Sequence, residues 1–528
     1  MKKQCLSIIF MFILVINTYI VMLMNVSDVV WAQQYYGSIE YYNYIDGANL
    51  TTSMVYINIT IYKSAPNSLW LIVPKNWNGN IISSNNLPLN VERHVLYLNN
   101  EENPFYVNLT INYHGPVSLS ITYKHPYTLL IVEPNAAYFS PLLGHSLWLR
   151  RTYVLDIRNV SFREIRSVSP SPAKIIIDEN GLRAIFEGSS FNRVSLFLTV
   201  NNYESFVNIS KGDLVIRTPE RYYSLARDLL DQVYTRYNNM TKLFGFSLEE
   251  TVITFYVPES QSDFSVGGYV PYSGGNVGDI HVNLIYYRGV DGEISLIILH
   301  ELVHRFLFKL NINPYELLWV HEGLAEFIST SLIKDLPASI NRIRLLNNLA
   351  RNLSGYGFIE NWKPSEQVSD ILVYYAASYA IFEKLSELYG GLDGYSKFFR
   401  VLSGRRVSST QDIIEALNDA WNTDVTPLFI KWGFTPLQRN DVLSLRTFIE
   451  NVAHNAESLP WWMQSIRWIT EIFINMARDN LEKGRLLLAG FYASVALIIY
   501  MYVVLLPYIV LVSIILLILL YFKKLVSR

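Results

Sequence analysis

The stretch of sequence that decides the fold is His300-Glu301-Leu302-Val303-His304. On a helix, residues four apart lie on one face, so His300 and His304 can both reach a single metal ion. Glu301 lies one step round the helix, where it can meet a water molecule bound to that metal. The spacing therefore predicts a helix that carries two metal ligands and a general base.

A second stretch, Trp319-Val320-His321-Glu322-Gly323, supplies the remaining ligand. Catalytic zinc takes three protein ligands and keeps one position open for water, and two imidazoles plus one carboxylate form a common set. Glu322 is therefore the predicted third ligand, and Zn²⁺ is the predicted cofactor. Zinc lowers the pKa of its bound water to about 7, so Glu301 would accept the proton as the water attacks a carbonyl group.

Both stretches are predicted to be helical. Asp291 can cap the first helix, and Asn311 with Pro314 can end it. A second helix is expected from about Val320 to Leu332, and it would place Glu326 one turn after Glu322. Because ligating histidines usually donate their second ring N–H to an acceptor, Glu326 is the predicted partner of His300 or His304. The apolar positions that support the first helix follow a period near 3.6: Ile294, Ile297, Ile298, Leu302, Phe306 and Leu310.

These motifs resemble the gluzincin zinc metallopeptidases, the group that includes thermolysin and the aminopeptidase N family. A downstream segment that begins at Tyr375 and runs on to Gly390-Gly391 resembles the aminopeptidase helix whose tyrosine stabilises the oxyanion. The resemblance implies that role for Tyr375, with Tyr374 and Tyr379 as alternatives. A further similar segment, Asp424 to Trp432, closes the catalytic domain in that family.

The chain also departs from that family. The gap between His304 and Glu322 is one or two residues shorter than in the best-known members. The Gly-x-Met-Glu-Asn segment that grips a free amino terminus is absent, and residues 267–282 stand in its place. This stretch is predicted to form a loop and an edge strand that could pair with an extended peptide. Exopeptidase activity is therefore not implied, and the choice between endopeptidase and exopeptidase stays open.

Both ends of the chain are apolar. Residues 1–32 read as a secretory signal peptide or an uncleaved anchor. Residues 486–522 carry no charge and exceed the roughly 20 residues that span a bilayer, so they are predicted to form a transmembrane helix, with a hairpin at Pro507 as the alternative. Positive residues in 523–528 favour a cytoplasmic tail. The predicted location is the cell membrane, with the lipid membrane as a partner and the catalytic domain on the extracytoplasmic side.

Charge, cysteine content and glycosylation sequences limit which binding partners and covalent modifications are expected. The formal net charge of −2, with no long basic block, argues against a nucleic-acid partner. Cys5, in the leader, is the only cysteine, so no disulfide is expected in the mature protein. N-glycans are possible at the Asn-x-Ser/Thr positions Asn49, Asn58, Asn108, Asn159, Asn208, Asn239 and Asn352.

The predicted fold class is α+β with several domains. Residues 33–215 alternate apolar and polar side chains and predict an antiparallel β-sandwich or saddle. Residues 216–440 are expected to form a thermolysin-like, mainly helical catalytic domain. A helical juxtamembrane segment at 441–485 and the transmembrane helix at 486–522 would follow.

The predicted function is that of a membrane-anchored, extracytoplasmic zinc peptidase acting on peptides or proteins, with Glu301 as general base. The alternative is a non-catalytic surface or envelope module that keeps the peptidase fold for binding. A third interpretation is an enzyme that uses the same site on a non-peptide amide or ester. Glu301 favours catalysis, because a binding module has no use for a carboxylate beside two ligand histidines.

Overall fold

The structure, a computed structural model, describes residues 35–526 except for 48–51, 63, 85–88, 99–100, 189–190, 202–203, 274, 365–367, 436–438, 461–462 and 483–484. The side chains at 98, 101, 439–441, 443, 482, 503–504, 506–511 and 521–526 are also outside the description. The predicted signal peptide or anchor at 1–32 and the sequon at Asn49 fall outside the described residues. The chain divides into two compact units, Met1–Ser205 with Tyr256–Ser265, and Phe206–Phe255 with Val266–Arg528.

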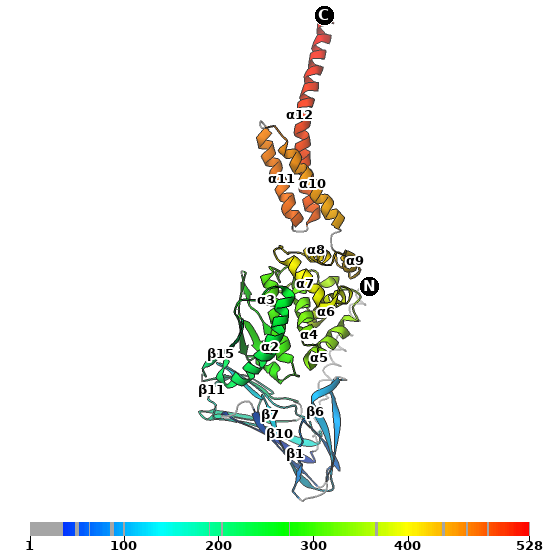
Figure 1. Ribbon diagram of the computed structural model, residues 1–528. Helices are drawn as coiled ribbons and strands as arrows, with labels where there is room; N and C mark the ends of the chain where they lie inside the picture. Colours follow the sequence, from blue (N-terminus) through cyan, green and yellow to red (C-terminus); the bar gives the residue numbers. More distant parts are fainter. Residues whose placement is uncertain are drawn as a thin grey trace, which may run out of the picture. The chain divides into compact units, whose positions relative to one another are not determined.

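The first unit is built from strands (Figure 1). Its sheets run in the orders β12-β13-β10-β1-β2-β7-β4, β11-β14-β9-β8 and β3-β6-β5. Their bounds are β1 (Gly37–Asp46), β2 (Thr52–Ile61), β3 (Ser68–Pro74), β4 (Ile82–Ser83), β5 (Asn90–Leu98), β6 (Glu101–Asn112), β7 (Val117–Pro126), β8 (Leu129–Val132), β9 (Asn135–Phe139), β10 (Leu149–Arg158), β11 (Phe162–Ser169), β12 (Lys174–Asp178), β13 (Gly181–Glu187) and β14 (Ser195–Val200).

The period-2 pattern of these strands explains the β core. In β2, the side chains of Val55, Ile57 and Ile59 are at most 1 % exposed, whereas Asn58 between them faces solvent. Successive side chains of a strand point to opposite faces, so alternation of this kind buries one face and leaves the other polar. The predicted N-terminal β domain is therefore present, although its strands form several sheets.

The second unit combines a mixed sheet with helices. The sheet runs in the order β15-β16-β17-β21-β18, so β18 lies at its edge. Its strands are β15 (Phe206–Lys211), β16 (Leu214–Pro219), β17 (Thr251–Tyr256), β18 (Gly268–Tyr269) and β21 (Ile280–Asn283), and the hairpin β19 (Tyr272–Ser273) and β20 (Asn276–Val277) lies beside them in sequence. The helices are α2 (Tyr223–Phe244), α3 (Glu293–Lys309), α4 (Leu318–Leu332), α5 (Pro337–Ala350), α6 (Ile371–Leu388), α7 (Gly391–Leu402), α8 (Thr410–Trp421) and α9 (Thr426–Lys431).

The helix that carries the histidine motif begins and ends close to its predicted limits. The residue before α3 is Gly292, whose φ of 87° is a left-handed conformation that glycine adopts without steric cost. Gly292 therefore occupies the cap position, and Asp291 does not. Beyond the helix, Asn311 has a φ of 58° and turns the chain away. Leu302 and Phe306 are fully buried, as the apolar period predicts.

Helix α4 can lie close against α6 because Gly323 has no side chain to keep the two helices apart. A Cβ atom at Gly323 would come within 2.7 Å of both the Ser378 carbonyl oxygen and the Phe382 ring. No real side chain fits at that distance. Trp319, on the same helix, stacks on Phe382 with ring centroids 5.6 Å apart. Because Gly323 directly follows Glu322, the packing of α4 on α6 also determines where the Glu322 carboxylate lies.

The last helices pack on one another. They are α10 (Arg439–Glu457), α11 (Gln464–Glu482) and α12 (Leu486–Val526). Ala493 and Ala496 of α12 are buried against Ile449 and Val452 of α10 and Ile474 of α11. The start of the apolar C-terminal run is therefore used for packing between helices.

The predicted C-terminal transmembrane helix is wrong. Across the described residues, no helix combines the length and the apolar character that a membrane crossing requires. The assignment of 486–522 as a transmembrane segment is corrected accordingly. The lipid-membrane partner was predicted through that segment and is corrected with it. The predicted cell-membrane location, with an extracytoplasmic catalytic domain and a cytoplasmic tail at 523–528, depended in part on the same segment and is corrected for the same reason.

Replacing Gly323 by Ala is expected to lower the free energy of unfolding by about 1–3 kcal/mol, because overpacking forces helices apart. The measurement is denaturant unfolding followed by tryptophan fluorescence. Gly490, inside α12, is the matched control, since its Cβ would meet only the Leu445 side chain at 3.9 Å. There the same substitution should leave stability unchanged or raise it by up to about 1 kcal/mol through helix propensity. Equal effects at the two positions would contradict the packing argument.

Candidate active site

Helices α3 and α4 bring the three predicted metal ligands together. The Nε2 atom of His300 lies 3.2 Å from Oε2 of Glu322, and Nε2 of His304 lies 3.6 Å from the same oxygen. One donor atom from each of the three residues falls within 4.8 Å of the others. Two ligands bound to zinc at about 2.1 Å in tetrahedral geometry are roughly 3.4 Å apart. The observed spacing therefore fits a single zinc ion.

The charges at this cluster favour a cation. Burial alone would raise the pKa of Glu322, but His304 and His300 hold it well below its usual range, so its carboxylate is ionised. Burial alone would lower the pKa of His300, yet the hydrogen bond with Glu322 and the charge of Glu326 raise it to about 9. A proton on His300 thus occupies the place that a metal ion would take, and metal binding must displace it.

Glu301 lies in the same cleft but is not part of the ligand cluster. The residue is 6 % exposed, and its burial raises the pKa of its carboxyl group, although His304 and His300 oppose the shift. The edge strand β18 passes close by. A Cβ atom at Gly268 would be 3.1 Å from Cγ of Glu301 and 2.8 Å from the Ile297 side chain. Glycine at this position therefore lets the strand approach the carboxylate.

Glu326 has a principal partner that the sequence did not reveal. It accepts two hydrogen bonds from the guanidinium of Arg342 on α5, one of them from Nε at 2.9 Å. Its predicted partner His300 lies farther away, with Nδ1 3.9 Å from Oε1 of Glu326. Bidentate pairing fixes the orientation of a carboxylate. Arg342 therefore holds Glu326 beside His300, and the two helices α4 and α5 are joined at the site.

His321 is a second residue that sequence reasoning missed. Its Nε2 lies 2.8 Å from the Ile312 carbonyl oxygen, which can only accept, so this nitrogen carries the proton and donates. Burial lowers the pKa of His321 to about 3, which keeps the ring neutral and makes Nδ1 an acceptor. His304 Nδ1 lies 3.3 Å from it and donates. The Nε2 atom of His304 then keeps its lone pair for a metal ion.

Tyr375 lies in the cleft, whereas the two alternative tyrosines, Tyr374 and Tyr379, lie elsewhere. Tyr375 lines the same cavity as the ligand cluster, and burial together with Glu322 and Glu326 raises its pKa well above the usual value. Tyr374 instead packs its ring against Phe358, at a centroid distance of 5.0 Å. Tyr379 donates a hydrogen bond to Glu383 at 2.7 Å. Of the three tyrosines, only Tyr375 is among the residues that line the cleft.

The cleft has a volume of about 350 Å³. Apart from the site residues already named, it is lined mainly by aromatic and apolar side chains from β18, β19, the end of α3 and the start of α4. Its described lining consists of Gly268, Tyr269, Val270, Tyr272, His300, Glu301, His304, Phe308, Pro314, Tyr315, Leu318, His321, Glu322, Pro364 and Tyr375.

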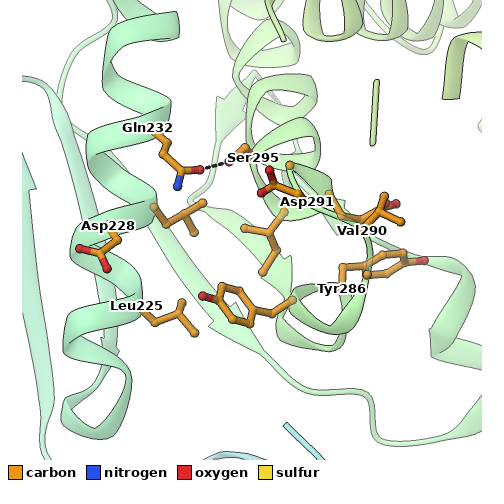
Figure 2. A pocket seen from close by; sticks show the side chains of 13 residues that line it. Leu225, Asp228, Gln232, Tyr286, Val290, Asp291 and Ser295 are labelled. Carbon is orange, nitrogen blue, oxygen red and sulfur yellow. Dashed lines mark hydrogen bonds between the residues drawn. The ribbon is translucent and has the colours of Figure 1, made fainter. Parts of the chain in front are cut away.

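A second, smaller hollow of about 230 Å³ lies at the other end of α3 (Figure 2). Gln232 of α2 faces Ser295 of α3 there, with the serine hydroxyl 3.4 Å from the amide oxygen. Asp228 and Asp291 also line it, but it contains no histidine and none of the predicted site residues. This hollow is therefore separate from the candidate active site.

Two solved structures that are similar to this chain share little of its sequence. No protein-family model matches the chain. No curated protein matches it either. Among solved structures, the chain is similar to native yeast LTA4 hydrolase, with 12 % identity and a TM-score of 0.31, over 81 % of this chain and 73 % of that one. It is also similar to Legionella pneumophila aminopeptidase A, with 16 % identity and a TM-score of 0.30, over 76 % of this chain and 49 % of that one, about half its length.

Replacing His321 by Phe is expected to weaken zinc binding by about 10- to 100-fold, the usual cost of removing the partner of a ligating histidine. Phenylalanine keeps a ring of similar size but offers no acceptor to His304. Zinc affinity would be measured by competition with a chelating dye. The same substitution at the exposed His454 of α10 is the control and should leave affinity unchanged. A folded His321→Phe protein that binds zinc as tightly as the wild type would contradict the assigned hydrogen bonds.

Proposed function

We propose that this protein is a zinc-dependent peptidase that hydrolyses peptide bonds in the cleft between α3 and α4. The observation that carries the proposal is the convergence of His300, His304 and Glu322 on one point, with Glu301 in the same cleft. When bound, zinc would polarise the scissile carbonyl group and lower the pKa of water.

In this proposal Glu301 is the general base. Its carboxylate accepts a proton from the attacking water and then donates it to the leaving amine. The burial that raises the pKa of Glu301 suits this task, since a base whose pKa is closer to neutrality can also act as the acid that protonates the leaving group. Glu301 is separate from the ligand cluster, so it remains available for proton transfer.

Tyr375 is proposed to donate a hydrogen bond to the carbonyl oxygen as that oxygen gains negative charge. Because its pKa is raised well above the usual value, its phenol keeps its proton in neutral solution and is able to donate a hydrogen bond. A preoriented donor of this kind stabilises the transition state more than the ground state. The Arg342 guanidinium lies 5.8 Å from the Tyr375 ring centroid and helps to hold the ring in place.

The proposed substrate is an extended peptide that lies along β18. This strand is the edge of its sheet and lines the cleft through Gly268 and Tyr269. An exposed edge can pair with the backbone of an added strand. Among the described residues that line the cleft, Glu301 and Glu322 are the only carboxylates. Both already have proposed roles, so we propose that cleavage requires no free amino terminus.

Replacing Glu301 by Gln is expected to abolish most turnover while zinc stays bound, because the change spares the ligands and removes the base. The loss should be about 10²–10⁴-fold in kcat. Hydrolysis of a peptide library would be followed by mass spectrometry, with metal content measured in parallel, using peptides whose amino termini are free or acetylated.

Treatment of the wild type with a chelator should remove activity, and zinc should restore it. A Glu301→Gln protein with wild-type rates would refute the mechanism, whereas a wild type that binds zinc but cleaves nothing would favour a binding module.

Replacing Tyr375 by Phe is expected to lower kcat by about 10²–10³-fold, which is the usual cost of losing one oxyanion donor. KM should change much less, because the bond forms chiefly in the transition state. Steady-state kinetics would separate the two parameters. Tyr374→Phe and Tyr379→Phe are matched controls, since both rings lie outside the cleft lining. If Tyr375→Phe is fully active, the proposed donor role fails.

A further inference from the structure

The first unit has a hollow of its own, which we call the β hollow, on one face of the sheet β3-β6-β5. The other face of this sheet belongs to the β core, through residues such as Leu109. Side chains alternate along a strand, and the register pairs Trp70 with Thr110 and Ile72 with Asn108, so these four lie together on the face away from that core. All four line the β hollow, whose volume of about 890 Å³ falls within the range of about 300–1,000 Å³ for small-molecule sites.

The segment 142–148 forms the second wall of the β hollow and is fixed to β3. Ile72 N–H donates to the Gly144 carbonyl oxygen at 2.9 Å, and Ser146 N–H donates to the Trp70 carbonyl oxygen at 3.0 Å. Trp70 N–H donates in turn to Oγ of Ser146 at 2.9 Å. A Cβ atom at Gly144 would lie 2.3 Å from Cδ1 of Ile72, so only glycine lets the segment come this close. The wall is therefore in place before any ligand arrives.

The lining of the β hollow combines indole rings with neutral polar groups. Trp70 and Trp148 both line it, and Trp70 is 37 % exposed, so an apolar surface is open to a ligand. The amides of Asn108 and Asn192 and the hydroxyl of Thr110 also line it, and each of these groups can both donate and accept hydrogen bonds. None of the described residues that line the hollow carries a charge. An ionised ligand would therefore be buried without a partner of opposite charge.

Asn108 has hydrogen-bonding capacity that the chain does not use. Its side-chain oxygen is buried and has no hydrogen-bond partner in the part of the chain that the structure describes. A buried acceptor without a donor costs free energy, and most such atoms in native proteins have a partner. A hydroxyl group of a bound ligand that reaches this amide would supply the missing donor.

These features match the chemistry of a sugar ring. A pyranose presents C–H bonds on its faces, which can pack on an indole, and hydroxyl groups around its edge, which both donate and accept hydrogen bonds. We infer that the β hollow binds a neutral saccharide, with a sugar ring on the indole of Trp70 and hydroxyl groups on the amide of Asn108. The inference does not depend on the proposed peptidase function, because every residue that it uses belongs to the first unit.

The test measures binding of trisaccharides of glucose, mannose and N-acetylglucosamine to the full chain by isothermal titration calorimetry. Because Asn108 begins an Asn-x-Thr sequence, the protein is made in a host that attaches no N-glycans, so that the hollow is open to free sugar. At least one trisaccharide should bind with a Kd of about 1 mM or less. Trigalacturonate, which is anionic, should bind at least about tenfold more weakly, because the lining offers its carboxylates no cation.

Two variants locate the site. Trp70→Ala should weaken binding by about tenfold or more, because the stacking surface is lost. Asn108→Ala should weaken it by about three- to tenfold, because the hydrogen bond to the sugar is lost. Trp468→Ala is the matched control, since it removes an exposed indole from α11, outside the first unit, and it should leave the Kd unchanged.

Every other outcome overturns the inference. It fails if none of the three trisaccharides binds, or if trigalacturonate binds as tightly as they do. It also fails if Trp70→Ala and Asn108→Ala bind sugar like the wild type, because the sugar would then lie elsewhere. Binding of the apolar dye Nile red that requires Trp70, without binding of any saccharide, would instead assign an apolar ligand. If Trp70→Ala does not fold, Asn108→Ala decides, since it removes a buried oxygen that has no partner.

Discussion

The contact between α3 and α4 is the constraint on which the site depends. The ligand atoms of His300 and His304 come from one helix, but the carboxylate of Glu322 comes from another, and a few ångströms of displacement would separate them. Gly323 lets α4 lie against α6 at the turn that carries Glu322. On the other side, Arg342 of α5 holds Glu326 one turn further along α4. Helix α4 is thus fixed from two directions, and its carboxylate faces the histidine pair.

The parts of the site that depend on local spacing could be predicted from sequence. A spacing of four positions between two histidines of a helix places both on one face whatever the rest of the fold does, and the prediction for Glu322 followed from the common zinc ligand set of two imidazoles and one carboxylate. His321 and Arg342 could not be found in this way. The role of His321 depends on the Ile312 carbonyl group in a loop, and that of Arg342 on a neighbouring helix. Neither relation has a signature in the spacing of residues along the chain.

The fold was predictable to a similar extent. Alternation in stretches such as β2 predicted a β domain, but alternation does not determine how strands are distributed among sheets, which depends on long-range pairing such as that of β1 with β10. At the C terminus, hydropathy alone was misleading. The run that begins at Leu486 was read as a membrane span, whereas its first alanines pack against α10 and α11. An apolar run indicates that a segment is shielded from water, but it does not show whether lipid or neighbouring helices shield it.

The pairing of Arg342 with Glu326 also sets the charge balance of the cleft. Three carboxylates gather around it: those of Glu301 and Glu322 line the cleft, and that of Glu326 lies beside His300. The Arg342 guanidinium offsets a single negative charge. With neutral imidazoles, two negative charges remain. A divalent cation would bring the sum to zero, whereas a monovalent ion would leave the buried cluster anionic and a trivalent ion would leave it cationic. The valence of the ion that would balance this cluster therefore depends on an arginine outside the group of candidate ligands.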